Sequence, residues 1–352
     1  MKALVLSGGT GSRLRPFSYS MPKQLMPVAN KPVLEYALEN VRQLGAQEVG
    51  LVVNEWGPTI AAALGDGSRF GLRITYIRQD EPRGLAHTVQ IARQFLGDSD
   101  FLMYLGDVML TESIAEIAAA FRSARPAAQV IVTKVAEPRS CGVVELDQDG
   151  AVIRLEEKPL RPRSDLALTG VYFFTSAIHR AVAAITPGAR GELEITDAVQ
   201  WLLSAGADVR ASLYYGYYAD TGRVEDLLVC NRKLLDRMAA SVAGEVDQAS
   251  ELVGAVVVEP GARIVASRIE GPAIIGSGAV VTGSHIGPHT SLGRDCRITG
   301  ARLDYSIVLD GAAISHVDGL HGSLIGRFAT VGRGDTHGRL VVGDHSRVEV
   351  AA

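Results

Sequence analysis

A glycine-rich, basic segment directly follows a short apolar run at the beginning of the chain. Residues 3–7 are apolar up to Ser7, and the next nine residues read Gly-Gly-Thr-Gly-Ser-Arg-Leu-Arg-Pro. Glycine adopts backbone angles closed to other residues and lets main-chain N–H groups approach an anion closely. Arg13, Arg15 and Lys23 bring positive charge to the same part of the sequence. The pattern predicts a strand that runs into a phosphate-binding loop, and it indicates transfer of a nucleotidyl group.

An ordinary turn after a buried strand is the alternative interpretation of these glycines. Their spacing does not match the G-x-x-x-x-G-K-[ST] loop, and the third glycine of the dinucleotide pattern G-x-G-x-x-G is missing. Two proline-bracketed lysine motifs follow, Pro22-Lys-Gln-Leu-Met-Pro27 and Asn30-Lys-Pro32. Lysine offers a compact ammonium group to a phosphate. The combination favours phosphate binding.

Two aspartates could hold a divalent cation. Asp107 follows the apolar run of residues 101–105, and Asp220 lies in the sequence Tyr217-Tyr-Ala-Asp-Thr-Gly222. Mg²⁺ commonly takes one or two carboxylates and completes its shell with phosphate oxygens and water. Each aspartate by itself could instead cap a turn. Together with the first motif, the pair predicts a magnesium site.

The first half of the chain alternates between two hydrophobic periods. Apolar runs typical of strands cover residues 48–53, 73–77, 101–105 and 129–135. Helical patterns separate them, at residues 33–44, 58–64, 84–95 and 113–121. This order predicts an α/β domain with a doubly wound, mostly parallel, Rossmann-like sheet. Such sheets bind ligands at the carboxyl ends of their strands, where the glycine loop and Asp107 are both expected.

Composition limits the partners and the location of the protein. The 352 residues carry 35 basic and 39 acidic side chains, a net charge of −4. The overall charge therefore does not indicate binding to nucleic acid or to an anionic membrane. The sequence lacks an apolar run long enough to span a membrane and a secretory pattern at its beginning, which predicts a cytoplasmic protein. Cys141, Cys230 and Cys296 are far apart and predict neither a disulfide framework nor a zinc site.

The character of the chain changes after a helical pattern at residues 223–240. From Glu251 onward it is rich in glycine and valine. Aliphatic residues recur at a six-residue spacing, at Ile274, Val280, Ile286, Leu292 and Ile298. Small residues lie two positions before four of these, at Gly278, Ser284, Thr290 and Cys296. Such a repeat predicts a left-handed parallel β-helix of hexapeptides whose aliphatic side chains fill the interior, with an antiparallel β domain as the alternative.

These patterns predict a catalytic domain at residues 1–240 and a β-helix domain at residues 241–352. Stacked coils leave open edges and flat apolar sides, so we expect the β-helix to pack between the subunits of a homo-oligomer. Histidines of that domain keep acyl transfer open as an alternative, and they are His285, His289, His316, His321, His337 and His345. Exposed turn residues are the simpler explanation for them.

The motifs of the first domain resemble those of a known family. The glycine loop, the motif of residues 22–27 and the Lys31-Pro32 pair are similar to the signature of the sugar-1-phosphate nucleotidylyltransferases, G-G-x-G-[ST]-R-L-x-P followed by P-K-x-L-x-P and K-P. The resemblance covers residues 1–240 and is greatest to members with a C-terminal extension that act on dTTP and glucose 1-phosphate. It implies a GT-A-like fold, Mg²⁺ as the cofactor, and dTTP and a sugar 1-phosphate as the substrates.

The resemblance assigns a role to each matching residue. Catalysis is expected to use Arg15, Lys23, Asp107 and Lys158. Nucleotide binding is expected at Leu6, Gly8, Gly9, Thr10, Gly11, Ser12, Arg13, Gln79 and Gly84. Contacts to the sugar phosphate are expected from Gly142, Glu157, Lys158, Thr169, Gly170 and Glu194. The metal ion is expected on Asp107 and Asp220. Glu194 could instead be an ordinary acid in the first turn of a helix.

Some positions depart from the family pattern and keep other functions open. Cys141 replaces a usual tyrosine, Val108 stands where asparagine is frequent, and Tyr218 and Ala219 stand where tryptophan and leucine are common. These positions match the sugar side of the family's site. The alternatives are therefore a modified sugar or cyclitol 1-phosphate as acceptor, UTP or GTP as donor, a bifunctional nucleotidyl- and acyltransferase, and a catalytically silent regulatory subunit.

Overall fold

The chain forms two compact units. The computed structural model describes the backbone of residues 1–349 and, within that range, the side chains of all residues except 333–337. One unit, called here the sheet unit, contains Met1–Gly9 and Leu34–Ala219, and the other, the β-helix unit, contains Thr10–Val33 and the chain from Asp220 onward. The two units do not follow the predicted division at residue 240, because residues 10–33 belong with the coils and the second unit resumes at Asp220. The predicted domain boundary itself stays a prediction.

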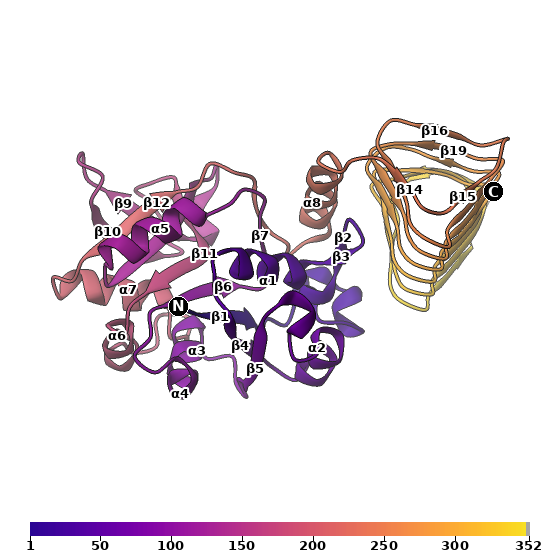
Figure 1. Ribbon diagram of the computed structural model, residues 1–352. Coiled ribbons are helices and arrows are strands. Elements are labelled where there is room, and N and C mark those ends of the chain that lie inside the picture. The colour runs from indigo at the N-terminus through magenta and orange to yellow at the C-terminus, as the bar shows by residue number, and fades with distance from the viewer. Residues whose placement is uncertain (350–352) are drawn as a thin grey trace. The chain divides into compact units, whose positions relative to one another are not determined.

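The sheet unit is built on a nine-stranded mixed sheet. Its main path runs β10-β9-β11-β6-β1-β4-β5, and β8 joins β11 to β12. The strands are β1 (Lys2–Ser7), β4 (Glu48–Val53), β5 (Arg73–Arg78), β6 (Phe101–Leu105), β8 (Ala128–Lys134), β9 (Gly142–Leu146), β10 (Val152–Glu157), β11 (Leu166–Phe174) and β12 (Val209–Leu213). The first four of these pair in parallel, as the sequence predicts, and Figure 1 shows them side by side. The later strands β9, β10 and β11 run antiparallel to their neighbours.

Helices connect these strands. They are α1 (Val33–Gln43), α2 (Gly57–Leu64), α3 (Leu85–Ile91), α4 (Arg93–Leu96), α5 (Ala115–Ala124), α6 (Ile178–Ala184) and α7 (Ile195–Ser204). The helix predicted at residues 84–95 is present as two pieces, because the chain leaves helical geometry at Ala92. Among residues 1–349, no helix combines the length and the apolar character that crossing a membrane requires.

The ends of β1 and β6 determine where the first loops leave the sheet. The two strands pair in parallel with Leu6 opposite Leu105, so both chains emerge at the same edge. The amide of Gly106 continues the pairing by donating to the carbonyl of Leu6 at 2.8 Å. A Cβ at Gly106 would lie 2.9 Å from that carbonyl oxygen, which is too close for a side chain. Gly8 and Asp107 therefore follow neighbouring strand ends, as expected for a ligand-binding edge.

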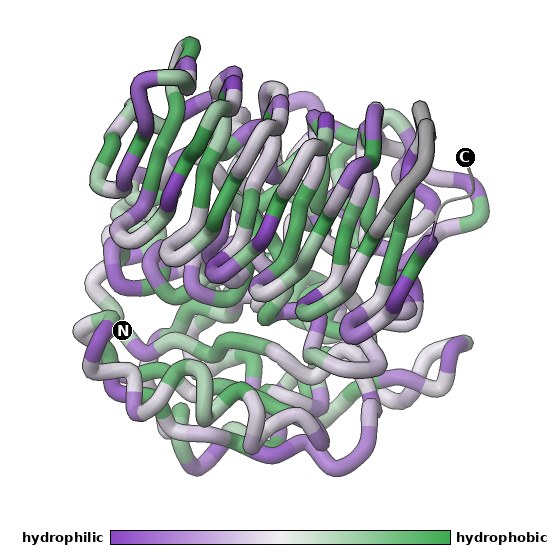
Figure 2. Tube along the Cα trace, turned by 90° about the vertical axis from the view of Figure 1, so that its right-hand side faces the viewer, coloured by the Kyte–Doolittle hydropathy of each residue, from purple (hydrophilic) through white to green (hydrophobic). Residues whose placement is uncertain are grey.

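The chain after residue 240 is a parallel sheet curled into stacked coils, consistent with the predicted left-handed β-helix (Figures 1 and 2). One side of the coils contains β14 (Ser241–Val242), β17 (Val256–Val258), β20 (Ala273–Ile275), β23 (Thr290–Leu292), β26 (Ile307–Val308), β28 (Leu324–Ile325) and β30 (Val341–Val342). The other two sides contain β15 (Glu245–Val246), β16 (Glu251–Val253), β18 (Arg263–Val265), β19 (Arg268–Glu270), β21 (Val280–Thr282), β22 (His285–Ile286), β24 (Arg297–Thr299), β25 (Arg302–Asp304), β27 (Ala313–His321), β29 (Thr330–Gly338) and β31 (Arg347–Glu349).

The coil repeat is shorter than a strict hexapeptide period implies. Serine hydroxyls accept backbone N–H groups of the next coil at a separation of 17 residues, as Ser267 does from Ser284 and Ser284 from Ala301. Most coils are thus one residue shorter than three hexapeptides, and the coil between the paired residues Ser291 and Ile307 is two residues shorter, so a six-residue period cannot continue along the coils. Beyond Ile298 the interior residues continue as Leu303, Val308 and Ile314, which sequence periodicity did not identify.

The prediction of interior residues is therefore wrong by one position at two places in the coils. Ile286, Leu292 and Ile298 lie inside the coils, as predicted. Next to Ile274 and Val280, however, it is Ile275 and Val281 that fill the interior. Because side chains alternate across a strand, Ile274 points outward, where it packs against Ala29 and Leu235. Leu235 ends α8 (Val224–Leu235), the helix that leads into the coils.

Candidate active site

The glycine loop begins in the sheet unit beside two side chains that follow neighbouring strands. The carbonyl of Gly8 accepts a hydrogen bond from Asn54 Nδ2 at 3.0 Å. A Cβ at Gly8 would lie 3.1 Å from Gln79 Oε1, so the loop backbone passes close to that amide. Asn54 follows β4, and Gln79 follows β5. Asn54 was not identified from sequence, although its place directly after a strongly apolar strand was a usable signal.

Gln79 is held by polar contacts from the following helix. Its Nε2 lies 3.1 Å from His87 Nδ1 and donates to the carbonyl of Gly84 at 3.4 Å. Burial lowers the pKa of His87, and the positive charge of Arg83 adds to this effect. The neutral imidazole can therefore accept the amide proton at Nδ1, which orients Gln79. In this orientation the amide can form two hydrogen bonds to the edge of a ring, one as donor and one as acceptor.

Gly84 is required where two chain segments meet. Its φ of 101° is unfavourable for a side chain, and a Cβ would collide with the backbone carbonyl of Leu193. The backbone of Leu193 donates to the carbonyl of Arg83 at 2.8 Å and accepts from Ala86 at 2.9 Å. These two bonds place Glu194, the next residue, beside the segment that carries Gln79 and Gly84.

Several residues expected at a sugar phosphate do lie together. Gly142 of β9 pairs with Glu157 of β10, and a Cβ at Gly142 would lie 3.0 Å from Glu157 Oε2. Lys158 Nζ lies 3.8 Å from Glu157 Oε1. The same Oε2 accepts a 2.6 Å hydrogen bond from the hydroxyl of Thr196 in α7. The Thr196 hydroxyl thus orients Glu157, and Lys158 adds a cation beside it.

Arg190 joins this cluster to Glu194 and was not identified from sequence. Its guanidinium donates to Glu194 Oε1 through Nε at 3.1 Å and through Nη2 at 2.6 Å, and lies 3.5 Å from Glu157 Oε1. The Glu194 side chain is only 6% exposed. Arg190 lies in the loop before α7 and Thr196 in the first turn of α7, and neither was assigned a role from sequence, so only their spatial proximity reveals them.

Thr169 and Gly170 lie in a bulge of β11. The register of β11 against β8 shifts between Leu168 and Tyr172. The hydroxyl of Thr169 is fully buried and donates to the carbonyl of Ile131 at 3.0 Å. Gly170 has a φ of 84°, and a Cβ there would lie 2.6 Å from Leu105. The bulge redirects the strand beside the end of β6, which is where Gly106 and Asp107 follow.

The remaining loop residues belong to the β-helix unit. Gly11 has a φ of 66° and precedes the short helix η1 (Ser12–Leu14). Leu14 and Phe17 are fully buried and anchor the loop, whereas Arg13 and Arg15 on either side of Leu14 are exposed. Arg15 lies over the ring of the exposed Tyr19, 4.9 Å from its centroid. The loop therefore presents arginines from a fixed backbone.

Lys23 begins another short helix, η3 (Lys23–Leu25), whose other residues Gln24 and Leu25 are buried. A Cβ at Gly11 would lie 3.1 Å from Lys23 Cβ. The absence of a side chain at Gly11 therefore makes room for the stem of Lys23. The glycine motif and the lysine motif are therefore packed against each other at this point.

The two aspartates belong to different units. Asp107 lies between β6 and β7 (Val108–Leu110) in the sheet unit. Asp220 ends β13 (Tyr218–Asp220) and belongs to the β-helix unit, where its Oδ2 lies 3.3 Å from Arg13 Nη2. A Cβ at Gly222 would lie 2.6 Å from that same Nη2 atom. Within the described residues, no group of three or more histidine, cysteine, aspartate or glutamate side chains is placed to hold a metal ion.

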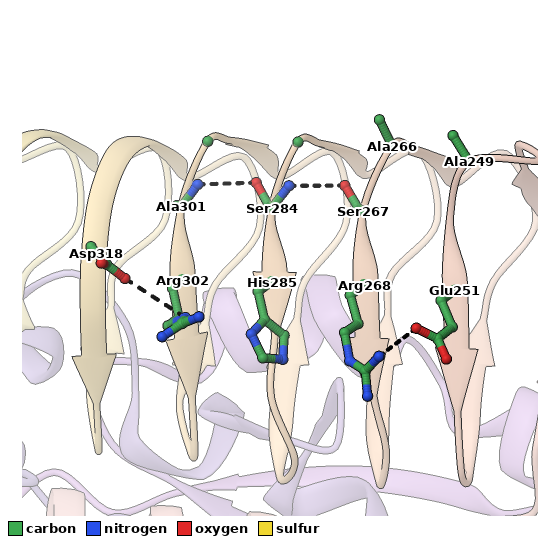
Figure 3. A pocket seen from close by; sticks show the side chains of 12 residues that line it. Ala249, Glu251, Ala266, Ser267, Arg268, Ser284, His285, Ala301, Arg302 and Asp318 are labelled. Atoms are coloured by element: carbon green, nitrogen blue, oxygen red, sulfur yellow. Dashed lines mark hydrogen bonds and ion pairs between the residues drawn. The ribbon is translucent and has the colours of Figure 1, made fainter.

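A groove of about 550 Å³ lies on the β-helix and contains His285. Figure 3 shows its row of charged side chains, in which Arg268 pairs with Glu251 and Arg302 lies 3.7 Å from Asp318. His285 Nε2 lies 3.4 Å from a carboxylate oxygen of Glu270. The row links successive coils, so we assign no reaction to it. The side chain of His337, another histidine considered for acyl transfer, lies outside the described residues.

The chain is similar in sequence and in fold to known proteins. A model of the nucleotidyl transferase family matches residues 2–237. The chain is 53% identical to a glucose-1-phosphate thymidylyltransferase of Streptomyces griseus over the whole length of both chains, and 51% identical to one of Streptomyces antibioticus over 99% of each. A solved Bacillus anthracis structure that carries the same enzyme name has a TM-score of 0.63 and 30% identity, over 68% of this chain and 97% of that one.

The family match extends over most of the candidate site residues described above. Nucleotidyl transferases of this kind generally use a divalent metal ion. The match covers the glycine loop, both lysine motifs, both aspartates and the Glu157 cluster, while the Streptomyces relatives extend the similarity through the coils. The chain therefore belongs to the nucleotidyl transferase family.

Proposed function

We propose that this protein transfers a thymidylyl group from dTTP to glucose 1-phosphate, giving dTDP-glucose and pyrophosphate. The observation that carries the proposal is the 53% identity, from end to end of both chains, to the Streptomyces griseus glucose-1-phosphate thymidylyltransferase. The altered residues Cys141 and Val108 are compatible with this reaction. Neither replaces a charged group that the chemistry requires.

The reaction is an in-line displacement at phosphorus. An oxygen of the sugar phosphate forms a bond to the α-phosphorus of dTTP, the bond to the β-phosphate oxygen breaks, and pyrophosphate leaves. We assign Lys158 to the nucleophilic phosphate, and Arg15 and Lys23 to the charge that develops on pyrophosphate. Gln79, with Gly84 beside it, would bind the edge of the thymine ring. Positioning and charge stabilisation then replace any covalent intermediate on the protein.

The cation we assign to this reaction is Mg²⁺, held by Asp107 and Asp220. Their carboxylate oxygens are the hard donors that Mg²⁺ prefers, and two carboxylates leave room for phosphate oxygens and water. When bound, the ion would neutralise phosphate charge and orient the α-phosphate. Arg13 lies 3.3 Å from Asp220 and brings a further positive charge to the same carboxylate.

The decisive experiment measures pyrophosphate release by the purified protein. The assay contains Mg²⁺ and glucose 1-phosphate with dTTP, UTP, GTP or ATP, and each nucleotide is also tested without sugar phosphate. We expect release with dTTP that depends on glucose 1-phosphate and exceeds release with the other nucleotides. Preference for another nucleotide would overturn the thymidylyl assignment. No release with any pair would overturn the proposed reaction and favour a modified acceptor or a silent subunit.

The electrostatics of Glu194 give a pH-dependent prediction. Burial raises the pKa of Glu194, Arg190 opposes the rise, and the charges of Glu157 and Glu192 add to it. We assign its ionised form to accepting hydrogen bonds from sugar hydroxyls. The active form is then lost as pH falls through a pKa that lies above the ordinary glutamate value of about 4.3. Glu194→Gln removes this titration.

We therefore compare kcat/KM for glucose 1-phosphate between the wild type and Glu194→Gln. The wild-type value divided by the variant value should rise with pH and level off above the raised pKa of Glu194. The ionisation of the substrate cancels in this ratio. We expect the Glu194→Gln change to affect kcat/KM for dTTP far less. A ratio independent of pH from about 4.5 to 8 would contradict the role given to Glu194.

A further inference from the structure

The segment with the phosphate-handling residues belongs to the β-helix unit. Thr10–Val33, called here the phosphate segment, forms one compact unit with the coils, although more than 200 residues of sequence separate them. It contains Arg13, Arg15 and Lys23. Two sets of contacts hold this segment on the coils.

The first contact lies before Lys23 and involves a buried carboxylate. The Asp344 side chain is 2% exposed, and Arg327 donates to its Oδ2 through Nε at 2.8 Å and Nη2 at 2.6 Å. The Ser20 hydroxyl donates to the same oxygen at 2.8 Å, and Arg327 Nη2 also donates to the Ser20 carbonyl at 3.2 Å. Charge-assisted hydrogen bonds to a buried carboxylate are the strong kind. Ser20 is thereby fixed to the last coils.

The second contact lies after Lys23 and centres on Asn231 of α8. Asn231 is fully buried. Its Oδ1 accepts from the Ala29 amide at 2.8 Å and from the Ser291 hydroxyl at 2.7 Å, and its Nδ2 donates to the His289 carbonyl at 3.0 Å. One amide side chain therefore joins the phosphate segment, α8 and two residues of the coils.

A further bond and a small apolar contact support this second point. Asn30 Nδ2 donates to the carbonyl of Leu292 at 2.7 Å. Ala29 packs with Leu235 of α8 and with Ile274, the residue that points outward from its coil. The segment is thus fixed at Ser20 on one side of Lys23 and at Ala29 and Asn30 on the other.

We propose that the β-helix is the platform that positions the phosphate segment for catalysis, with Arg327, Asp344 and Asn231 as positioning residues. The inference rests on the proposed function of Lys23 and Arg15 at the leaving pyrophosphate. A platform fixed on both sides of Lys23 keeps its ammonium in place without reorganisation when charge develops. Loss of one anchor lowers kcat more than it raises KM, because the charge to be stabilised is greatest in the transition state.

The coils contain a matched control pair. Arg294 donates to Asp310 through its backbone N at 2.9 Å and through Nε at 3.1 Å, and Arg327 donates to Asp344 through the same two groups at 2.7 and 2.8 Å. The Arg294 pair links one coil to the next. The Arg327 pair does this too and also binds Ser20. Substitution of each arginine by methionine therefore removes the same coil contact, but only Arg327→Met removes the anchor of the phosphate segment.

The test measures steady-state kinetics and amide hydrogen exchange of the full chain without substrates. We expect Arg327→Met to lower kcat about tenfold and to speed exchange in peptides from residues 10–33, whereas Arg294→Met leaves both within about twofold of wild type. Arg327→Lys should restore part of both effects. The exchange result does not depend on activity, so a failure of the proposed reaction and a failure of the platform are distinguishable.

A second variant covers the case in which Arg327→Met does not fold. Ser20→Ala removes one hydrogen bond to Asp344 and leaves the Arg327–Asp344 pair in place, so the coils keep their ion pair. We expect faster exchange at residues 10–33 and a fall in kcat of about threefold. Normal kcat and exchange in Arg327→Met and Ser20→Ala, or equal effects of Arg294→Met and Arg327→Met, would overturn the platform.

Discussion

Replacement of Lys23 by alanine is expected to lower kcat by about two to three orders of magnitude while the protein stays folded. The ammonium group is assigned to the negative charge that collects on pyrophosphate, and water cannot replace a positioned cation at that point. The side chain is partly exposed, and the buried residues Gln24 and Leu25 keep η3 anchored without it. Loss of stability should therefore be small, and the effect should appear in kcat.

Kinetics and circular dichroism of Lys23→Ala and two further variants check this prediction. Lys134→Ala is the matched control, because Lys134 is exposed and lies 4.0 Å from Asp165 at the surface. We expect it to keep wild-type activity within twofold. Lys23→Arg keeps the charge but replaces the compact ammonium with a larger, planar group, so it should recover only part of the rate. Near-normal turnover of folded Lys23→Ala would disprove the role of Lys23.

Replacement of either aspartate by asparagine should also lower kcat by about two to three orders of magnitude, because the amide keeps the shape and removes the charge that binds Mg²⁺. Asp107→Asn acts in the sheet unit and Asp220→Asn in the β-helix unit. Since both are assigned to one ion, the double variant should be little worse than each single variant. Each variant should also require a higher Mg²⁺ concentration for half-maximal rate.

Magnesium titrations of activity check this pair. Asp208→Asn serves as the control, because Asp208 is an exposed carboxylate that pairs with Arg210 at 2.8 Å. It should keep both kcat and the Mg²⁺ requirement. If Asp107→Asn or Asp220→Asn showed a wild-type rate with an unchanged Mg²⁺ requirement, that residue would not be a ligand. Fully additive losses in the double variant would mean that the two carboxylates act independently.

The local sequence was sufficient to predict features that depend on a single strand or a single turn. The predicted strands at residues 48–53 and 101–105 match β4 and β6 residue for residue. Their continuous apolar character follows from burial on both faces of a parallel sheet. Gly11 was noticed for the same kind of reason, because a positive φ leaves a glycine as its trace in a sequence, whereas Gly84 was identified through the family resemblance.

Side-chain partners brought together by folding were missed. Arg190, Thr196 and Asn54 each bind a predicted site residue or the loop itself, yet none belongs to a motif. Their contribution is a position in space, such as the 2.6 Å bond from Thr196 to Glu157. A sequence pattern reports which chemical groups are present, and it contains no distance between residues that are far apart along the chain.

The sequence by itself determined the class of reaction, the parallel core of the sheet and the presence of stacked coils, because glycine spacing, apolar runs and short repeats are local properties. Only the tertiary structure decided the register inside the coils, where a repeat of 17 residues places Ile275 rather than Ile274 in the interior. It also decided that residues 10–33 belong with the coils. That choice depends on hydrogen bonds such as Ser20 to Asp344, which join residues 324 positions apart and are formed only when the chain has folded.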